Sequence, residues 1–169
     1  EGFVAGTEGK VPGGSDSVVG LGNLKNDYYA QFLEAEGATV FWPAVEFILA
    51  LEKASVKVAV ASSSKNCALI LKKVQLPDGS GRTLFDLFNS PASARVDGET
   101  VLEMTLDGRP IKGKPDPDIF LKAAKLLGVD FENSVVVEDA VKGVQAGAAG
   151  KFGLVLGVNS EGPAHGDAL

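Results

Sequence analysis

The sequence predicts an α/β fold in which a Rossmann-like parallel sheet is flanked by helices. Three short apolar stretches, rich in valine and other β-formers, occur at 56–61, 135–137 and 152–158. Strands that are apolar along their whole length are typical of parallel sheets covered by helices. Helical patterns separate the three stretches, and this alternation of strand and helix is the pattern of an α/β protein.

Two helices are expected before the first strand, outside the alternation of strands and helices. Apolar residues recur at helical spacing over 24–36, as in Leu24, Tyr28 and Phe32, and predict an amphipathic helix. Pro43 suits the start of a second helix, because the first helical position needs no N–H donor. We therefore predict a helical accessory piece over 1–42 and an α/β core over 43–169.

The remaining segments are interpreted from their periodicity and from their Gly, Pro and polar residues. Expected helices are 66–74, 84–88, a helix capped by Asp116 and ended by Gly128, and 140–148; a short strand is expected at 94–96, and irregular chain at 1–20, 97–112 and 159–169. Asp86 and Asp97 are expected at the surface, in turns.

Composition narrows the range of partners. The chain has 169 residues, is 45% hydrophobic and 22% charged, and carries a net charge of -6. This composition predicts a folded domain, and neither nucleic acid nor an anionic membrane is expected to bind it. Its single cysteine, Cys67, excludes an internal disulfide and predicts a cytoplasmic location. A small phosphorylated molecule remains possible, and the oligomeric state is left open.

The N-terminal segment has the features of an interior point in a longer chain. The sequence EGFVAGTEGK lacks an initiator Met, a basic start and the apolar stretch of a signal peptide. No apolar run reaches the roughly 20 residues of a membrane span. We therefore expect a longer natural protein without a secretion signal at this point.

Polar residues follow the first predicted strand directly. In an open parallel sheet, ligands bind beyond the carboxyl ends of the strands. Ser62, Ser63, Ser64, Lys65 and Asn66 combine hydroxyl groups, a cation and a helix start, which suits an anion. The alternative is an ordinary serine-capped helix start.

Two further motifs suggest phosphate chemistry. Lys114 stands before Pro115-Asp116-Pro117, so a rigid loop could aim its ammonium at a phosphoryl group; the alternative is a plain loop lysine. Glu138 and Asp139 follow the second strand and offer hard oxygen ligands for Mg²⁺, unless Asp139 only caps the next helix. In that helix Gly143 and Gly147 are poor helix formers, which predicts close packing against a neighbour.

These motifs together resemble those of a known superfamily. ASSSKN, GKPDPDIF and VVVEDAVKGVQAGAAG are similar to the second, third and fourth motifs of the haloacid dehalogenase superfamily, in its β-phosphoglucomutase-like form. The resemblance runs from the GLGNLKND segment to the LVLGVN strand. It implies a Rossmann-like core with part of a helical cap.

The resemblance also implies a role for each matching residue. Ser62 would bind the transferring phosphate, and Lys114 would hold that phosphate and the nucleophile. Mg²⁺ would bind Glu138 and Asp139. The substrate would meet the segment that includes Ser63, Ser64, Lys65 and Asn66, and also Lys25 of the cap.

One departure from the family pattern bears on activity. The first motif, an Asp-x-Asp at the end of the central strand, has no counterpart near the N-terminus. Asp116 and Asp118 match by letters only, since they follow Pro115 and start a helix. The missing strand would lie between the strands at 56–61 and 135–137. Its absence would leave two rows of backbone groups unpaired.

We therefore expect Mg²⁺-dependent phosphoryl transfer on a small phosphorylated sugar, by a phosphomutase or phosphatase, in the complete protein. The chain as it stands is expected to be inactive. One alternative is a catalytically dead phosphate-binding or interaction module. Another is a dehalogenase, against which the Glu138-Asp139 pair argues, because halide displacement needs no Mg²⁺. His165 and Cys67 lend no support to Ser-His or Cys-His hydrolysis.

Overall fold

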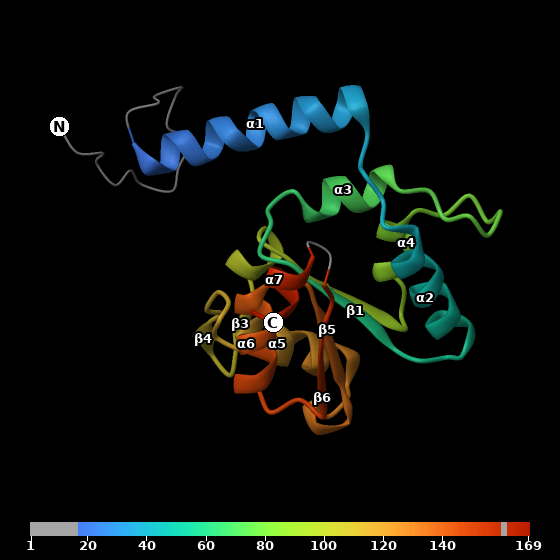
Figure 1. Ribbon diagram of the computed structural model, residues 1–169, viewed down its shortest axis with the longest axis vertical. Helices are drawn as coiled ribbons and strands as arrows, with labels where there is room; N and C mark the ends of the chain where they lie inside the picture. Colours follow the sequence, from blue (N-terminus) through green and yellow to red (C-terminus); the bar gives the residue numbers. More distant parts are fainter. Residues whose placement is uncertain (1–16, 160–161) are drawn as a thin grey trace. The chain divides into compact units, whose positions relative to one another are not determined.

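The computed structural model describes residues 17–159 and 162–169, and the chain divides into two compact units. The first unit runs to Val40 and the second begins at Phe41 (Figure 1). The expected irregular segment over residues 1–16 lies outside the described residues. The predicted domain boundary after residue 42 stays a prediction.

The first unit holds one long helix, α1 (Val18–Glu36). It begins six residues before the predicted start at 24, because Ser17 caps it: its hydroxyl oxygen accepts the Gly20 N–H at 3.0 Å. The predicted apolar stripe is largely exposed, with Tyr28 at 63% and Phe32 at 56%. The periodicity therefore located the helix correctly, while most of its apolar face stays open to solvent.

The second unit contains the predicted parallel strands, in pairs. β1 (Val58–Ala61) pairs with β2 (Ser93–Val96), and β5 (Val135–Glu138) pairs with β6 (Leu154–Gly157); both pairs are parallel. These pairs confirm the α/β class. Across residues 17–159 and 162–169 no ladder joins β1 to β5, so the two pairs are separate sheets.

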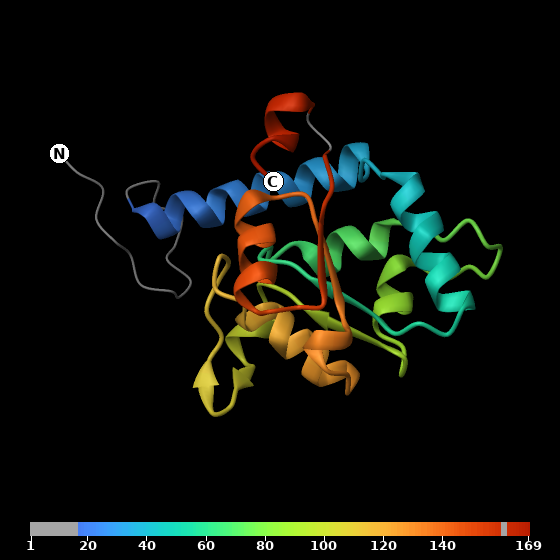
Figure 2. The ribbon, with the colours of Figure 1, turned by 60° about the horizontal axis from the view of Figure 1, so that its bottom comes forward.

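Helices cover these strands and form the core. α5 (Asp118–Leu127) packs on β1 and β2, while α6 (Val141–Ala149) packs on β5 and β6 (Figures 1 and 2). The central buried cluster consists of Val96, Ile119, Phe120, Ala123, Val136 and Ala146. Three further helices, α2 (Trp42–Lys53), α3 (Cys67–Lys73) and α4 (Leu84–Phe88), lie on the other side of the β1–β2 pair.

Close packing of α6 on its sheet depends on Gly147. A Cβ at this position would lie 3.0 Å from the Val155 side chain and 3.2 Å from that of Val136. The expectation that this glycine permits close approach is confirmed. The helix and the sheet approach each other there without an intervening side chain.

The apolar sequence of β5 and β6 predicted a sheet buried on both faces, and this prediction is wrong. Val136 is 5% exposed, but its neighbours Val135 and Val137 are 55% and 50% exposed. Leu154 and Leu156, their partners in β6, are 49% and 44% exposed. Within the second unit α6 covers one face of this sheet, and alternate residues therefore face solvent.

The segment expected to be irregular between β2 and α5 contains a small hairpin. β3 (Thr105–Leu106) and β4 (Arg109–Pro110) are antiparallel and joined by Asp107 and Gly108, with φ of 52° and 79°. Two central residues with positive φ suit a tight hairpin turn. The predicted turn is thus present, and the strands beside it were missed because they are only two residues long.

Three short helices complete the second unit: η1 (Thr100–Leu102), η2 (Phe131–Asn133) and α7 (Pro163–Gly166). The expected end of α5 is confirmed, since Gly128 adopts a left-handed conformation there. Its expected cap is wrong. The capping position belongs to Pro117, and the Asp116 carboxylate lies 3.5 Å from Lys112 Nζ instead.

Candidate functional site

Lys114 links the carboxyl ends of two strands that do not pair with each other. Its Nζ donates to the Ala61 carbonyl at the end of β1 (3.2 Å) and to a carboxylate oxygen of Glu138 at the end of β5. The ammonium also lies 4.7 Å from the centre of the Phe120 ring. The Lys114 side chain is 13% exposed, so this is not an ordinary solvated loop lysine.

Lys114 retains capacity for a ligand. A lysine ammonium has three N–H donors. Within residues 17–159 and 162–169, Ala61 and Glu138 account for two of them. The geometry therefore leaves one donor for an anion at the rim formed by the ends of β1 and β5.

Glu138 is held from two sides. One oxygen pairs with Lys114, and the other accepts the Ala140 N–H at 3.2 Å. A Cβ at Gly143 would overlap this carboxylate, so the predicted close packing of Gly143 is confirmed and its neighbour is Glu138. A residue with a side chain at 143 would occupy the position in which the carboxylate meets Lys114.

Asp139 is placed differently from Glu138. It is exposed, and it makes no hydrogen bond or ion pair with any residue in the described ranges. The alternative role of helix capping does not apply, because the capping position of α6 is Ala140 and no side chain caps it. Its carboxylate oxygens are thus open to a solute ligand.

Two adjacent carboxylates fit the chemistry of Mg²⁺ in part. This cation favours oxygen ligands, keeps several waters and is often bound by one or two carboxylates together with a substrate phosphate. Asp139 could supply such an oxygen directly, with Glu138 beside it. Among the described residues no three His, Cys, Asp or Glu side chains form a complete metal cluster, so the remaining ligands would have to come from elsewhere.

The serine loop from Ser62 to Asn66 continues the β1–β2 ladder before it turns away. The Ser62 N–H donates to the Val96 carbonyl at 2.9 Å. Ser62 Oγ then accepts the Ser64 N–H at 3.2 Å, and Ser64 Oγ accepts the Asn66 N–H at 3.1 Å. The hydroxyls therefore shape the loop itself, and the side chain of Asn66 does not cap the seven-residue helix α3.

The side chains of the serine loop differ in exposure. Ser63, Ser64 and Lys65 are exposed, whereas Ser62 is half-buried beside the Lys114 contact at Ala61. This arrangement leaves the residues predicted to meet a substrate accessible to solvent. Lys25, the other residue predicted to bind substrate, is an exposed residue of α1 in the first unit.

The structure corrects the expectation that Asp97 lies at the surface. It was expected in a surface turn, but it is fully buried, at 0% exposure. One carboxylate oxygen accepts the N–H groups of Glu99 (3.1 Å) and Thr100 (2.9 Å), and the other pairs with Arg95. A DG pair alone signals a turn, and burial of its carboxylate depends on Arg95, which the turn pattern does not reveal.

Cys67 is a packing residue. It is 5% exposed, and burial raises the pKa of its thiol, an effect that the nearby Asp97 carboxylate reinforces. A raised pKa disfavours the thiolate, so a nucleophilic role is not supported.

The Asp-x-Asp sequence at the start of α5, Asp116 to Asp118, has a structural role. Asp118 is 1% exposed and binds both terminal nitrogens of Arg109, while the Lys112 N–H donates to it at 3.0 Å. The Arg109 hydrogen bonds hold the pKa of Asp118 well below its usual range. A carboxylate occupied in this way is not available as a nucleophile.

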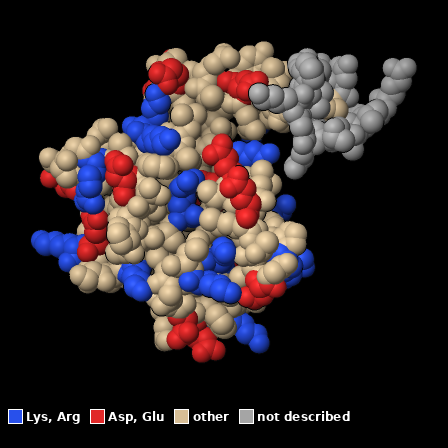
Figure 3. Space-filling model, turned by 180° about the vertical axis from the view of Figure 1, so that it is seen from behind, with Lys and Arg blue, Asp and Glu red and all other residues tan. Residues whose placement is uncertain are grey.

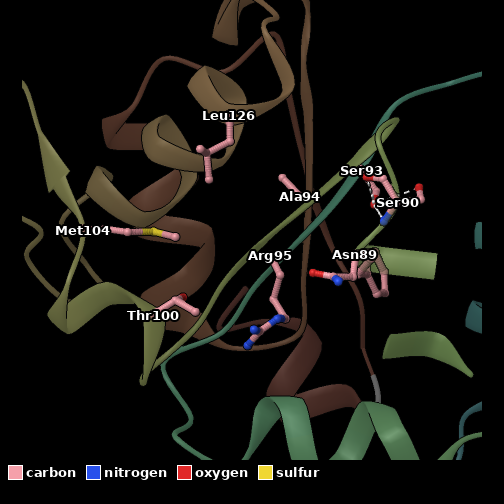
Figure 4. Close-up of a pocket in the computed structure, with 9 residues that line it drawn as sticks. Asn89, Ser90, Ser93, Ala94, Arg95, Thr100, Met104 and Leu126 are labelled. Atoms are coloured by element: carbon pink, nitrogen blue, oxygen red, sulfur yellow. Dashed lines mark hydrogen bonds between the residues drawn. The ribbon is translucent and has the colours of Figure 1, made fainter. Parts of the chain in front are cut away.

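A separate hollow of about 320 Å³ lies along β2, away from the Lys114 contact. Its labelled side chains come from β2, from the α4–β2 connection, from η1 and the residues after it, and from the end of α5 (Figure 4). Ser90 and Ser93 there bond each other and the backbone. Arg95 also lines this hollow, and its buried Nε has no hydrogen-bond partner among the described residues. The hollow does not contain the predicted site.

Side chains of both charges occur on the surface. On the face shown in Figure 3, basic and acidic side chains are interspersed. None of the helices in the described segments is both long enough and apolar enough to traverse a bilayer.

Known proteins resemble this chain over most of its length. The sequence profile of the haloacid dehalogenase-like hydrolases matches residues 8–151. Proteins named Beta-phosphoglucomutase from Mycobacterium bovis and Mycobacterium tuberculosis are each 42% identical over 153 residues, which cover 90% of this chain. The chain spans 52% of the length of each of these two relatives.

Solved structures give the same result for the fold. A β-phosphoglucomutase from Clostridium difficile has a TM-score of 0.59 at 22% identity, over 88% of this chain and 57% of its own. An archaeal β-phosphoglucomutase from Pyrococcus has a TM-score of 0.61 at 25% identity, over 85% of this chain and 55% of its own. The chain therefore belongs to the haloacid dehalogenase-like hydrolase family, in its β-phosphoglucomutase-like subfamily.

Proposed function

We propose that this chain supplies the phosphate-holding part of an Mg²⁺-dependent enzyme that transfers a phosphoryl group on a small phosphorylated sugar. The observation that carries the proposal is the position of Lys114 between Ala61 at the end of β1 and Glu138 at the end of β5. The names of the mycobacterial relatives suggest the reaction class, a sugar-phosphate mutase.

Lys114 would offset negative charge on the transferring group. A phosphoryl group carries charge on its three equatorial oxygens, and a fixed cation stabilises that charge without first having to reorient. The pairing with Glu138 and the contact with Ala61 fix the ammonium before any ligand arrives. Ser62, the residue after Ala61, would place its hydroxyl group against the same phosphate.

Asp139 and Glu138 would hold the metal. When bound, Mg²⁺ would neutralise phosphate oxygens and help to align the reacting groups. Asp139 is the better direct ligand, because it is exposed and has no partner in the described parts of the chain. Glu138 would contribute from beside it, through the carboxylate that Lys114 and the Ala140 N–H already orient.

The remaining polar residues of the serine loop would contact the sugar phosphate. Ser63, Ser64 and Lys65 are exposed, and Asn66 follows them at the start of α3. We propose that these residues bind the non-reacting end of the substrate, and that Lys25 contributes from the helical unit. Lys65 is the cation of this set within the core.

We further propose a strand between β1 and β5 that lies outside the described residues. β1 and β5 have no ladder between them in the described residues, yet Lys114 connects their carboxyl ends. Both observations suit a further strand between β1 and β5, carrying the nucleophilic aspartate. For that reason we propose that the 169-residue chain alone is inactive.

The test compares the 169-residue chain with the complete gene product. With Mg²⁺ and p-nitrophenyl phosphate, we expect turnover from the complete protein and none from the chain. Lys114→Ala in the complete protein should lower kcat/KM by about 100-fold or more, since it removes a charge-stabilising donor. Lys112→Ala is the matched control, because its side chain is 67% exposed and lies in the same loop.

Each outcome has a defined meaning. Turnover that survives Lys114→Ala would discredit the site, and robust turnover by the 169-residue chain would discredit the missing strand. A complete protein that binds inorganic phosphate without any turnover would favour a catalytically dead binding module. Product analysis with glucose 1-phosphate separates a mutase, which forms glucose 6-phosphate, from a hydrolase, which releases phosphate.

A further inference from the structure

The loop after β2 lies directly against the serine loop after β1. The Gly98 N–H donates to the Ser64 carbonyl at 3.2 Å. A Cβ at Gly98 would lie 2.7 Å from the Lys65 nitrogen and from the Ser63 carbonyl oxygen, and 2.8 Å from the Ser64 carbonyl carbon. All three are backbone atoms, which cannot move aside as a flexible side chain can.

Asp97 holds Gly98 in this position. Its carboxylate accepts the N–H groups of Glu99 and Thr100, and its own N–H donates to Thr100 Oγ1 at 2.9 Å. Arg95 pairs with the same carboxylate and extends from β2 in Figure 4, where Thr100 is seen on η1. A fully buried carboxylate with these three partners defines one conformation for the turn that contains Gly98.

The serine loop is joined to β2 through the Ser62 N–H and the Val96 carbonyl, and to the start of α3 through the Cys67 N–H and the Ser64 carbonyl. Its two internal bonds are made by Ser62 and Ser64 hydroxyls, at 3.2 and 3.1 Å, and Ser63, Ser64 and Lys65 are exposed. Hydroxyl turns of this kind are weak restraints in water. The contact with Gly98 is therefore a tertiary restraint on the middle of the loop.

We propose that Asp97 and Gly98 are positioning residues that hold the serine loop in its phosphate-binding conformation. The inference rests on the proposed function for the identity of the ligand. Gly98 acts by being small, since it lets two loop backbones meet. Asp97 acts by fixing the turn, and neither residue touches the substrate.

The test uses Gly98→Ala in the complete gene product, with Gly22→Ala as the matched control. A Cβ at Gly22 meets nothing within 4 Å. Amide exchange and chemical shifts of residues 62–66 report the loop, and titration with inorganic phosphate reports binding. We expect Gly98→Ala to speed exchange in the loop and to weaken phosphate binding at least 10-fold, with no change in the amides of β5 and β6.

A second variant guards against a misfolded Gly98→Ala protein. Thr100→Val keeps the shape of the side chain but removes the oxygen that accepts the Asp97 N–H. We expect a smaller effect in the same direction, about 3-fold on phosphate binding. Loop exchange and phosphate affinity equal to wild type in both variants would overturn the proposal.

Failure of the proposed function would look different. If wild-type protein shows no phosphate-dependent shift at residues 62–66, the loop does not bind phosphate. The exchange data would then still decide whether Asp97 and Gly98 set the loop conformation. Uniform loss of protection across the whole second unit would indicate a general structural role and would also overturn the positioning proposal.

Discussion

Glu138 and Gly143 depend on each other. The carboxylate that pairs with Lys114 occupies the space that a side chain at 143 would need. Alanine normally stabilises a helix by about 1 kcal/mol relative to glycine. Here that gain competes with displacement of a carboxylate that is 9% exposed and charge-paired. The stability of a Gly143→Ala variant therefore reports whether the Lys114–Glu138 pair is as rigid as its contacts indicate.

We expect Gly143→Ala to lower the free energy of unfolding by about 1–2 kcal/mol, because overpacking costs more than helix propensity returns. Urea denaturation measures the change. In a Glu138→Ala background the conflict disappears, and Gly143→Ala should become neutral or stabilising. Equal effects of Gly143→Ala in both backgrounds would show that Glu138 is not the neighbour that constrains this position.

α4 illustrates how a very short helix is stabilised by its cap. It has five residues, and Thr83 at its N-cap forms a reciprocal capping box with Asp86 in its first turn. Thr83 Oγ1 accepts the Asp86 N–H at 3.3 Å, while the Asp86 carboxylate accepts the Thr83 N–H at 2.8 Å. The hydrogen bond from the Thr83 N–H is the largest cause of the lowered pKa of Asp86. Asp86 is thus an N-terminal capping partner as well as an exposed residue.

Thr83→Ala should lower the free energy of unfolding by about 1 kcal/mol, since it removes the acceptor for the Asp86 N–H. Thr83→Ser keeps that oxygen and should cost much less. Chemical denaturation of the two variants in parallel measures the difference. If both variants were equally unstable, the methyl group and not the cap would account for the role of Thr83.

The free energy of unfolding of the second unit should depend on pH because of Asp118. The paired Arg109 holds the pKa of this buried carboxylate below its ordinary value of 3.8. A carboxylate with a depressed pKa in the folded state binds protons more weakly there than in the unfolded chain. It therefore stabilises the fold at pH values above the unfolded pKa, and this stabilisation is lost as the pH falls below about 4.

Asp118→Asn should lower the free energy of unfolding by about 1–3 kcal/mol at pH 7, because it removes a charged hydrogen-bonding partner of Arg109. The difference from wild type should shrink as the pH falls from 5 toward 2. Denaturant titrations at several pH values measure it. Asp107→Asn is the comparison for an exposed ion pair and should have a much smaller effect, since the Asp107 side chain is 74% exposed and lies 2.9 Å from Lys125 Nζ. A difference that stays constant with pH would contradict the assignment to Asp118.

Local patterns predicted many elements because each depends on near neighbours in the chain. The apolar runs located β1 and β5, the helical spacing located α5, and the DG pair located the turn at Asp107. The positions of Ser62, Lys114 and Glu138 at or near strand ends followed from strand order. Patterns failed for Asp97, because a DG pair signals a turn and does not reveal burial, and for the exposed Val135 and Val137, whose exposure depends on which elements cover the sheet.

The sequence alone was sufficient for the fold class, the approximate positions of the main strands and the motifs that place the chain in its family, because periodicity and short motifs are local properties. Tertiary structure was needed to show that Lys114 contacts Ala61 and Glu138, that Gly143 faces a carboxylate, and that Gly98 contacts the serine loop. The contacts of Lys114 and Gly98 join residues that are distant in sequence. Only the packing of the folded chain determines which backbone and side-chain atoms share the same space.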